Sequence, residues 1–535
     1  MIKLTLKALP MAVLALGLNA GPAVAQGIDI PFFNEDNYPE LISLPASAEA
    51  TGLPAFIGEI AEPNALPPIF IPPNPYLAEQ GRNGLHGDNY NSDVYNYPGP
   101  LGNNPQVSSR QIGAIGTCPT VVFDPNGNVV TVCIGLAQVR LFLMEPHSLE
   151  VLAEHSLPLR AAFAEGRFDE LLTDSSGGGY FHVDNLGRAL IGPANQQIET
   201  WEAVEVKKNQ WEWQLVKAHN LSAVLDEGVQ LQDAITDYHN RTWFTTSPGI
   251  VGYISEVTGQ TEIIDLEEDL QNSLVLDLGT EGTETTAGYY IVTVEALYKL
   301  MTNVDGSIYV KWRKPYLNDA GDVGLLSTGS GTTPTAFGNN DDLIAIADNS
   351  AVRINLNVYV RETGEQICQF PMFDENASAT ENSPIGYGND VVLENNAGYG
   401  GPFGDPLAVT PGLTRLHVKD DLSGCEQVWH NDELIGQTTP RLSTKTGLIY
   451  SYTVKAGTPI AGIIPTFGWY FTAIDWNTGE VVNETWVGSG PFWNNVLDPV
   501  TLGPDGTAYA GTLSGIMSIR DCQNFNANSG KCKDK

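Results

Sequence analysis

Residues 439–486 read TPRLSTKTGLIYSYTVKAGTPIAGIIPTFGWYFTAIDWNTGEVVNETW, and this stretch carries the pattern that decides the fold. A small polar residue and a proline lead into a short apolar strand, a turn with glycine and a second strand. Two further strands follow, and the turn NTGE joins them. Four short strands separated by tight turns are typical of one antiparallel blade of a β-propeller.

The same pattern recurs along the chain. Its eight copies begin near positions 119, 177, 233, 286, 334, 384, 440 and 499. Neighbouring copies start between 48 and 59 residues apart. A steady period of this size, with several strands in each period, predicts a propeller rather than a sandwich.

We therefore predict an all-β protein whose residues 118–521 form an eight-bladed β-propeller of four-stranded antiparallel blades. Seven blades is the alternative, because the weak copy near Thr286 can also be an insertion. The last copy shows three strands, so we expect residues 106–116, QVSSRQIGAIG, to supply the fourth and close the ring. The rest of residues 26–117 is expected as an irregular N-terminal wrap, and residues 522–535 as a tail.

Residues 1–25 are interpreted as a secretory signal peptide. Lys3 and Lys7 supply a basic start, residues 8–18 an apolar core, and the Ala-Val-Ala at 23–25 a cleavage site. No cysteine follows this site, so we expect no lipid anchor, and no later segment is apolar over the roughly 18 residues that a membrane span needs. The sequence therefore predicts a periplasmic or secreted protein without a membrane span.

Export makes the six cysteines candidates for disulfide bonds. Cys118 and Cys133 flank a predicted hairpin, and Cys522 and Cys532 can staple the tail. The two that remain, 368 and 425, are then left to pair with each other. None lies in a CxxC or CxxCH motif, which argues against covalent haem and thioredoxin-type redox chemistry.

The charge balance excludes some partners. The chain has 63 acidic and 27 basic residues, a formal net charge of −36. A protein that tracks phosphates needs clustered cations, so nucleic acid and anionic membrane surfaces are not expected as partners. A small-molecule or oligomeric substrate is compatible with this charge, and the oligomeric state is left open.

Residues 439–486 also resemble a blade of the quinoprotein alcohol dehydrogenase-like superfamily, whose blades carry PQQ-like repeats. The motif Ala-x-Asp-x-x-Thr-Gly in its third-to-fourth strand turn is matched by Ala473, Asp475, Thr478 and Gly479. The turn at 362–364 is a partial second copy, whereas the tryptophan that follows the motif in the family is replaced by Asn483, with Trp486 three residues later. One branch of the superfamily uses pyrroloquinoline quinone with a vicinal cysteine pair, and another contains outer-membrane assembly lipoproteins with a lipobox; this chain has neither feature.

In a propeller the innermost strands start at one mouth of the axis, where small ligands usually bind. Alignment of the copies places these residues near that mouth: Cys118, Ser176, Asp233, Glu284 or Thr285, Thr333, Asn382, Arg441 and Asn495. His182 and His239 are expected at equivalent places in consecutive blades, close enough to meet near the axis. The loop at 394–406, ENNAGYGGPFGDP, is a candidate cover for the mouth.

From this set we select candidate roles. The candidate catalytic residues are Asp233, Glu284, Arg441, His182 and His239. The candidate ligand-binding residues are Ser176, Thr333, Asn382, Asn495 and Trp493. No HxH or HxxxH pair occurs, so no metal site is predicted. The alternative for the whole set is structural: the groups hydrogen-bond one another and axial water.

Three functions remain open at this stage. The first is an exported enzyme that acts on a small or oligomeric polar substrate at the axial mouth by acid/base chemistry. The second is a non-enzymatic periplasmic binding or assembly scaffold. The third, implied by the resemblance, is a quinone-dependent dehydrogenase, so the cofactor is unknown with quinone as the alternative.

Overall fold

The computed structural model describes residues 38–113, 115–164, 166–167, 177–270, 272–321, 328–459, 465–522, 525–526 and 531–532. The predicted signal peptide at 1–25 and the candidate Ser176 lie outside the described residues. The described part is almost entirely β, with two short α-helices, α2 (Ala48–Thr51) and α3 (Ala161–Ala164), and two 3₁₀ turns, η2 (Pro406–Ala408) and η3 (Pro491–Trp493).

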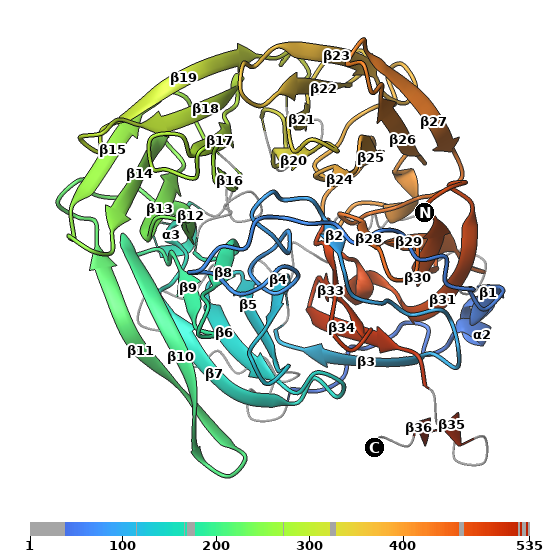
Figure 1. Cartoon of the computed structure of the whole chain (residues 1–535). Coiled ribbons are helices and arrows are strands. Elements are labelled where there is room, and N and C mark those ends of the chain that lie inside the picture. The colour runs from blue at the N-terminus through green and yellow to red at the C-terminus, as the bar shows by residue number, and fades with distance from the viewer. Residues whose placement is uncertain are drawn as a thin grey trace.

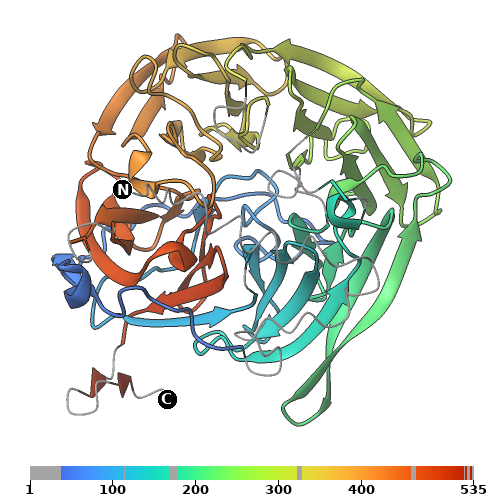
Figure 2. The same ribbon diagram turned by 180° about the vertical axis from the view of Figure 1, so that it is seen from behind.

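Eight antiparallel blades form a closed ring (Figures 1 and 2). The strands of each blade are given from the innermost outward. Blade 1 contains β4 (Gly116–Phe123), β5 (Val129–Gly135), β6 (Val139–Met144) and β7 (Val151–Leu157), and blade 2 contains β8 (Phe181–Val183), β9 (Ala189–Ile191), β10 (Gln197–Lys207) and β11 (Gln210–Asn220). Blade 3 contains β12 (Leu231–Thr236), β13 (Arg241–Thr246), β14 (Ile250–Ser255) and β15 (Thr261–Asp265), and blade 4 contains β16 (Val275–Asp277), β17 (Gly288–Val292), β18 (Ala296–Thr302) and β19 (Ile308–Pro315). Blade 5 contains β20 (Thr335–Phe337), β21 (Leu343–Ala347), β22 (Asn355–Val360) and β23 (Gln366–Pro371), and blade 6 contains β24 (Ile385–Tyr387), β25 (Asp390–Glu394), β26 (Leu413–Val418) and β27 (Cys425–Asn431). Blade 7 contains β28 (Arg441–Ser443), β29 (Leu448–Ala456), β30 (Phe467–Asp475) and β31 (Val481–Ser489). The eight-bladed prediction is confirmed, and the seven-bladed alternative is wrong.

Blade 8 combines the two ends of the chain. It contains β32 (Val500–Leu502), β33 (Ala508–Thr512) and β34 (Gly515–Arg520), and its outer strand is β3 (Gln106–Gln111), from the segment selected above. The register of β3 on β34 runs from Gln106 opposite Arg520 to Gln111 opposite Gly515. This pairing covers the edge that β34 would otherwise expose and closes the ring.

Blade 7 receives two more strands from the N-terminal region. Strand β1 (Phe56–Gly58) pairs antiparallel with its outer strand β31, and β2 (Val94–Tyr95) pairs parallel with its inner strand β28. The N-terminal region therefore touches both the rim and the axis of the ring.

Residues 81–97, called the axial segment below, run through the centre of the ring rather than only wrapping around it (Figure 1). Its backbone carbonyls accept hydrogen bonds from the innermost strands of five blades. The donors are the N–H groups of Val183, Leu276, Ala336, Gly386 and Leu442, and the acceptors are the carbonyls of Asn83, Asn89, Tyr90, Ser92 and Asp93. These bonds satisfy backbone donors that face the axis, and they hold the segment in place.

Blade 4 departs from the sequence alignment. Its innermost strand is β16 (Val275–Asp277), whereas the copy aligned at Thr286 starts at the second strand, β17. The connection between them is long, and this hid the short strand Val-Leu-Asp from the pattern. Glu284 consequently belongs to that connection, and its side chain is 62% exposed.

Tryptophans in outer strands dock on the next blade. The indole N–H of Trp429 donates to the carbonyl of Trp476 at 2.9 Å, and the Trp429 ring packs where a side chain on Gly479 would lie. Trp312 repeats this contact at the interface of blades 4 and 5, donating to the carbonyl of Arg361 at 3.1 Å beside Gly364. Both glycines have positive φ in the turn between the third and fourth strands. A glycine is favoured at this position because it adopts positive φ without strain and leaves room for the indole ring of the docking tryptophan.

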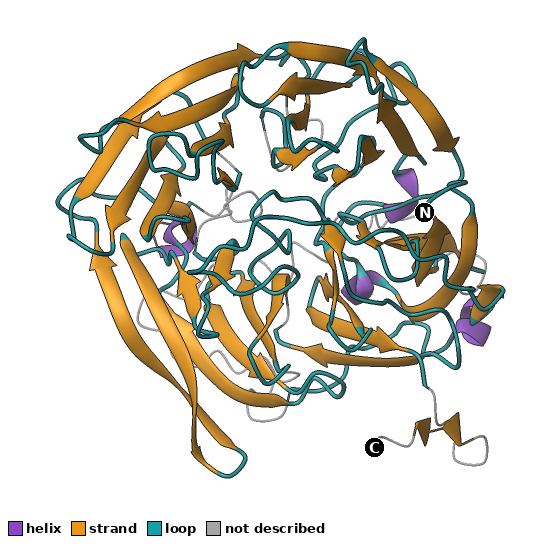
Figure 3. Cartoon of the chain, viewed as in Figure 1, coloured by secondary structure: helices purple, strands orange, loops and turns teal. Residues whose placement is uncertain are grey.

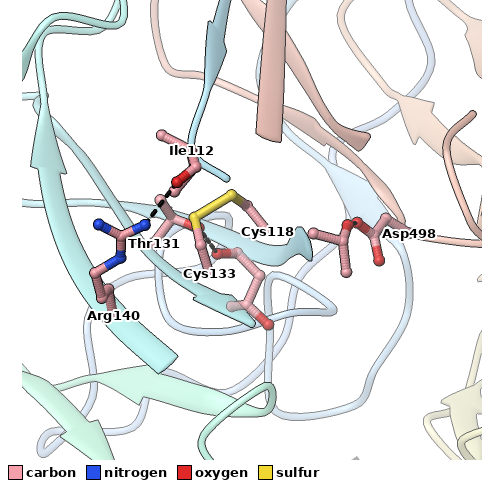
Figure 4. The surroundings of a disulfide bond; sticks show 8 residues. Ile112, Cys118, Thr131, Cys133, Arg140 and Asp498 are labelled. Atoms are coloured by element: carbon pink, nitrogen blue, oxygen red, sulfur yellow. Dashed lines mark hydrogen bonds between the residues drawn. A yellow bond between two sulfur atoms is a disulfide. The ribbon is translucent and has the colours of Figure 1, made fainter. Parts of the chain in front are cut away.

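The three disulfides pair as predicted. Cys118–Cys133 joins the two inner strands of blade 1 (Figure 4), Cys368–Cys425 joins the outer strands of blades 5 and 6, and Cys522–Cys532 closes the tail. Disulfides persist in oxidising compartments, which indicates an extracytoplasmic protein. In the part of the chain that the structure describes, no helix is long and apolar enough to cross a membrane.

Removal of the Cys368–Cys425 bond should destabilise the ring, because it closes a loop of 57 residues across a blade interface. Loop entropy gives about 4 kcal/mol, and for a chain of this size that corresponds to a loss of about 4 °C in Tm. Calorimetry of C368A/C425A checks this. The matched variant C522A/C532A, which opens only the tail, should leave Tm unchanged; an equal fall in both variants would contradict the assignment.

Candidate functional site

The starts of the innermost strands form a continuous ring of hydrogen bonds around the axis. One bond crosses each of the eight blade interfaces, and we call this set the axial ring. In order from blade 1 the contacts are Thr120 to the carbonyl of Gly179, His182 to Asp233, Ser273 to Asp233, Thr333 to Asn272, the N–H of Thr333 to Ser383, Asn382 to the carbonyl of Thr438, Thr438 to the carbonyl of Asp498, and Thr117 to Asp498. Much of the predicted polar set is therefore engaged in joining the blades.

At one point the axial ring meets the axial segment through an imidazole. His86 of the axial segment places Nε2 3.1 Å from Thr333 Oγ1 and Nδ1 2.7 Å from Asp93 Oδ1. Arg441 forms an ion pair with the same Asp93 oxygen. All four side chains are at least 95% buried. The result is a hydroxyl–imidazole–carboxylate relay that ends on a guanidinium.

The tautomer of His86 follows from its partners. The Asp93 oxygen that faces Nδ1 also forms the ion pair with Arg441, and a carboxylate oxygen in an ion pair accepts hydrogen bonds. Nδ1 of His86 must therefore carry the proton. Nε2 then has a lone pair 3.1 Å from the Thr333 hydroxyl, whose single proton can go either to this nitrogen or to Asn272 Oδ1; a general base requires such a lone pair.

Glycines in the sequence GRNGLHG at 81–87 bring His86 to this position. The N–H of Gly87 donates to the carbonyl of Gly84 at 3.0 Å, closing a turn with His86 inside it. A Cβ on Gly84 would lie 2.4 Å from His182 Nδ1, so the backbone passes directly over that imidazole. Arg441 of blade 7 also donates to the carbonyl of Leu85 at 2.7 Å, which fixes the turn at a second point.

A second imidazole–carboxylate pair lies beside the relay. His182 Nε2 is 3.1 Å from Asp233 Oδ1, and both side chains are buried. Burial would raise the pKa of Asp233, but the His182 charge and hydrogen bonds from His182, Ser273 and the Ala234 N–H lower it. Asp233 is therefore a carboxylate at neutral pH.

Tyr180 connects this pair to the relay. Burial, together with the Asp233 charge, raises the pKa of its phenol to about 12 against the opposing effect of a hydrogen bond with Thr333. The phenol consequently stays protonated at neutral pH.

Two buried carboxyl groups also lie near the axial ring, Glu394 in blade 6 and Asp498 at the start of blade 8. Burial raises the pKa of Glu394 and of Asp498 to about 8 in each case. Glu394 is surrounded by donors, with Asn382 and the Thr438 N–H on Oε1 and Ser451 on Oε2, whereas Asp498 accepts from Thr117. Both groups hold a proton at neutral pH.

The other predicted residues lie apart from the relay. Glu284 is exposed in the β16–β17 connection and is 3.8 Å from Arg241. Trp493 is 4% exposed and packs against Gly488, and Asn495 donates to the carbonyl of Gly511 at 2.9 Å. Neither presents an open ligand-binding face.

The predicted equivalence of His182 and His239 is wrong. Asp184 and Asp237 open the same kind of turn, since each N–H donates to the carbonyl four residues later at 2.9 Å. His182 precedes its aspartate by two residues and therefore corresponds to Ile235, whereas His239 follows its aspartate inside the β12–β13 turn. The two imidazoles therefore differ in position by four residues when the two turns are superposed on their aspartates.

The loop at 394–406 lies near the axial ring. Burial first, and then the charges of Asp498 and Glu381, raise the pKa of Tyr399 in this loop, so its phenol lies close to blades 6 and 8. The loop is tied down by Gln437 on the carbonyl of Pro406 at 2.7 Å.

Quinone and metal sites each place requirements on the cysteines and the metal-ligating side chains. All six cysteines are paired with partners 10, 15 or 57 residues away, so the vicinal pair that the quinoprotein resemblance would require does not fit this chain. Among the described residues, no group of three or more His, Cys, Asp or Glu side chains is placed to hold a metal ion.

His86 and Asp93 are the functional candidates that sequence reasoning missed. They lie in a segment without strand periodicity, and neither belongs to a repeat. The available signal was the spacing of Gly81, Gly84 and Gly87 around the histidine, because glycines at such intervals mark a backbone that approaches its neighbours closely.

The raised pKa of Asp498 predicts how stability depends on pH. A carboxyl whose pKa is raised by folding gives stability that is present below its unfolded pKa near 4 and lost as pH rises through about 8. Between pH 5 and 9 the wild type should lose more Tm than D498N, by at least about 2 °C. Thermal melts across pH check this. The control D421N should follow the wild type over this range, because Ser423 lowers the pKa of Asp421; parallel curves for D498N and wild type would refute the assignment.

Comparison with known proteins gives distant similarity only. No family model matches the sequence. An uncharacterised protein of Archaeoglobus fulgidus is 23% identical over 330 residues, which cover 55% of this chain and 61% of that protein. The chain thus spans about three fifths of the length of the curated relative it matches.

Solved structures are similar at low TM-score. BamB from Moraxella catarrhalis has a TM-score of 0.40 and 12% identity over 80% of this chain and 97% of that chain. A functionally unknown protein from Desulfotomaculum acetoxidans has a TM-score of 0.36 and 10% identity over 67% of this chain and 96% of that chain. A chain of a mitotic checkpoint complex gives 0.36 and 9% identity over 62% and 82% of the two chains.

Proposed function

We propose that this protein is an exported enzyme that acts on a small polar substrate at the axial site, with His86 as its general base. The observation that carries the proposal is the relay of Thr333, His86 and Asp93, in which the base has an oriented tautomer and a hydroxyl partner within 3.1 Å. A histidine with a purely structural role does not require a connected series of hydroxyl, imidazole, carboxylate and guanidinium groups. Tyr180 and the protonated Glu394 and Asp498 add neutral donors to the same region.

The net charge of the chain and the ion pair at the axis restrict the charge that the substrate can carry. Arg441, the guanidinium at the axis, is already neutralised by Asp93, and the chain carries a net charge of −36. An anionic substrate would be repelled by this charge, and the Arg441 guanidinium that could offset the repulsion is already paired. The proposed substrate is therefore neutral or cationic.

The docking of Trp312 and Trp429 on Thr-Gly turns supports membership in the quinoprotein alcohol dehydrogenase-like superfamily as an architectural relationship. This membership is proposed for the PQQ-like repeat alone. The quinone-dependent activity is not part of the proposal, because the cysteine pairing does not fit it.

A second candidate function, a binding or assembly scaffold, is favoured by one feature. The hairpin of β10 and β11 extends beyond the ring (Figure 3), and Val206, Leu215 and Val216 on it are 43%, 49% and 45% exposed. Exposed apolar side chains on a projecting hairpin are typical of partner contacts. The variant V206S/L215S/V216S keeps Trp211 and Trp213 packed on the core of blades 1 and 2 and should leave Tm unchanged; if a native partner is then lost while axial activity persists, the scaffold function is separate.

Loss of the base tests the proposed enzyme. The chain from residue 26 onward is assayed on a panel of neutral and cationic esters, lactones, amides and glycosides. A general base contributes about 100-fold or more, so H86Q should reduce any activity found by at least this factor. H417Q, which changes a surface imidazole on β26, should keep it. Activity that is equal in H86Q and wild type, or absent across the panel, would rule out the proposal.

A further inference from the structure

We infer that Thr333 is a nucleophile and that the axial site transfers acyl groups from neutral or cationic carboxylic esters through an acyl-threonine intermediate. This inference rests on the proposed function and names its substrate class. Its basis is the position of Thr333 Oγ1, which is the only hydroxyl that the structure places in hydrogen-bond contact with His86 among the described residues.

The Thr333 hydroxyl has a defined direction. Its backbone N–H donates to Ser383 Oγ at 3.0 Å, and the following Pro334 restricts the backbone at this position. The hydroxyl has one proton and two acceptors within reach, His86 Nε2 at 3.1 Å and Asn272 Oδ1 at 3.3 Å. Rotation of the O–H bond from Asn272 to the nearer imidazole nitrogen places the proton for transfer while Oγ1 stays where it is.

The groups around His86 favour transfer of the Thr333 proton to its imidazole. The Asp93 carboxylate faces Nδ1 of His86, so an imidazolium formed by uptake of the Thr333 proton is stabilised where it arises. Asn272 offers no basic group, and its amide oxygen cannot take the proton at neutral pH. Tyr180, whose phenol stays protonated and contacts Thr333, is the neighbouring donor for negative charge that develops on a substrate carbonyl.

The reaction balances with water as the second substrate. Oγ1 of Thr333 attacks the ester carbonyl carbon, a new C–O bond forms, and the hydroxyl proton passes to His86 Nε2. The bond to the leaving alkoxide then breaks, and the alkoxide takes the proton from His86. Water repeats the same two steps on the acyl-threonine, which releases the acid and restores the hydroxyl. The net change is ester plus water to acid plus alcohol, with no redox step.

A covalent probe tests this without knowledge of the natural substrate. An uncharged alkyl fluorophosphonate reacts with activated hydroxyls, expels fluoride and leaves a stable phosphonate ester. Intact mass and peptide mapping of the wild type should show one adduct on Thr333. T333S should also be labelled, whereas T333V and H86Q should lose the labelling rate by at least 100-fold. T335V removes a buried hydroxyl two residues away that bonds only backbone carbonyls, and it should be labelled as the wild type is.

The outcomes separate the inference from the proposed function. No adduct in the wild type, an adduct on another residue, or equal labelling of T333V overturns the nucleophile. If H86-dependent hydrolysis of a substrate nevertheless persists in T333V, the enzyme stands and His86 activates water directly. If the adduct forms as expected but the substrate panel gives no turnover, the nucleophile stands and the broader function fails. Circular dichroism and Tm of each variant confirm that the ring has folded.

Discussion

The ring of hydrogen bonds at the starts of the innermost strands is the constraint on which the rest of this molecule depends. A propeller blade can pack on its neighbours through apolar faces at many small offsets, because dispersion and apolar burial have little direction. A hydrogen bond has a preferred length and angle. One such bond at each of eight interfaces therefore fixes the relative height of the blades, from Thr120 in blade 1 around to Asp498 and Thr117.

The axial segment depends on that alignment. Its carbonyls at 89, 90, 92 and 93 meet the inner strands of blades 4 to 7 in order, so a shift of one blade along the axis would leave buried backbone groups without partners. His86 and Asp93 are carried on this segment and owe their positions to it. The chemistry at the axis is thus made of two parts: a hydroxyl from the ring and a base from the segment that the ring holds.

Repetition determined what the sequence could reveal. The period between copies predicted eight blades, and the hairpin at the first copy predicted that Cys118 and Cys133 lie side by side, because both conclusions rest on local sequence patterns. Thr333, Asp233 and Arg441 could be placed near the axis since they occupy a fixed place in each copy. Glu284 was misplaced where a long connection concealed the three-residue strand β16, and a single such strand has too few residues to show a pattern.

His86 and Asp93 could not be found in this way. Their contacts to Thr333 and Arg441 join positions more than 240 residues apart, and no local pattern reports such a contact. The same limit applies to Tyr180, whose role depends on the neighbouring blade. Sequence repetition describes the frame of a propeller well and says little about a unique segment that threads it.

The strand β3 has a consequence for the order of assembly. Translation proceeds from the N-terminus, so residues 106–111 and the axial segment emerge long before β34 and the inner strands they pair with. Until then these N-terminal residues have no sheet to join, and blade 1 cannot be locked to blade 8. A chain interrupted anywhere before residue 515 has no closed circle and presents open strand edges to proteases. A chain interrupted before residue 441 also lacks the Arg441 partner of Asp93, so its axial site is incomplete.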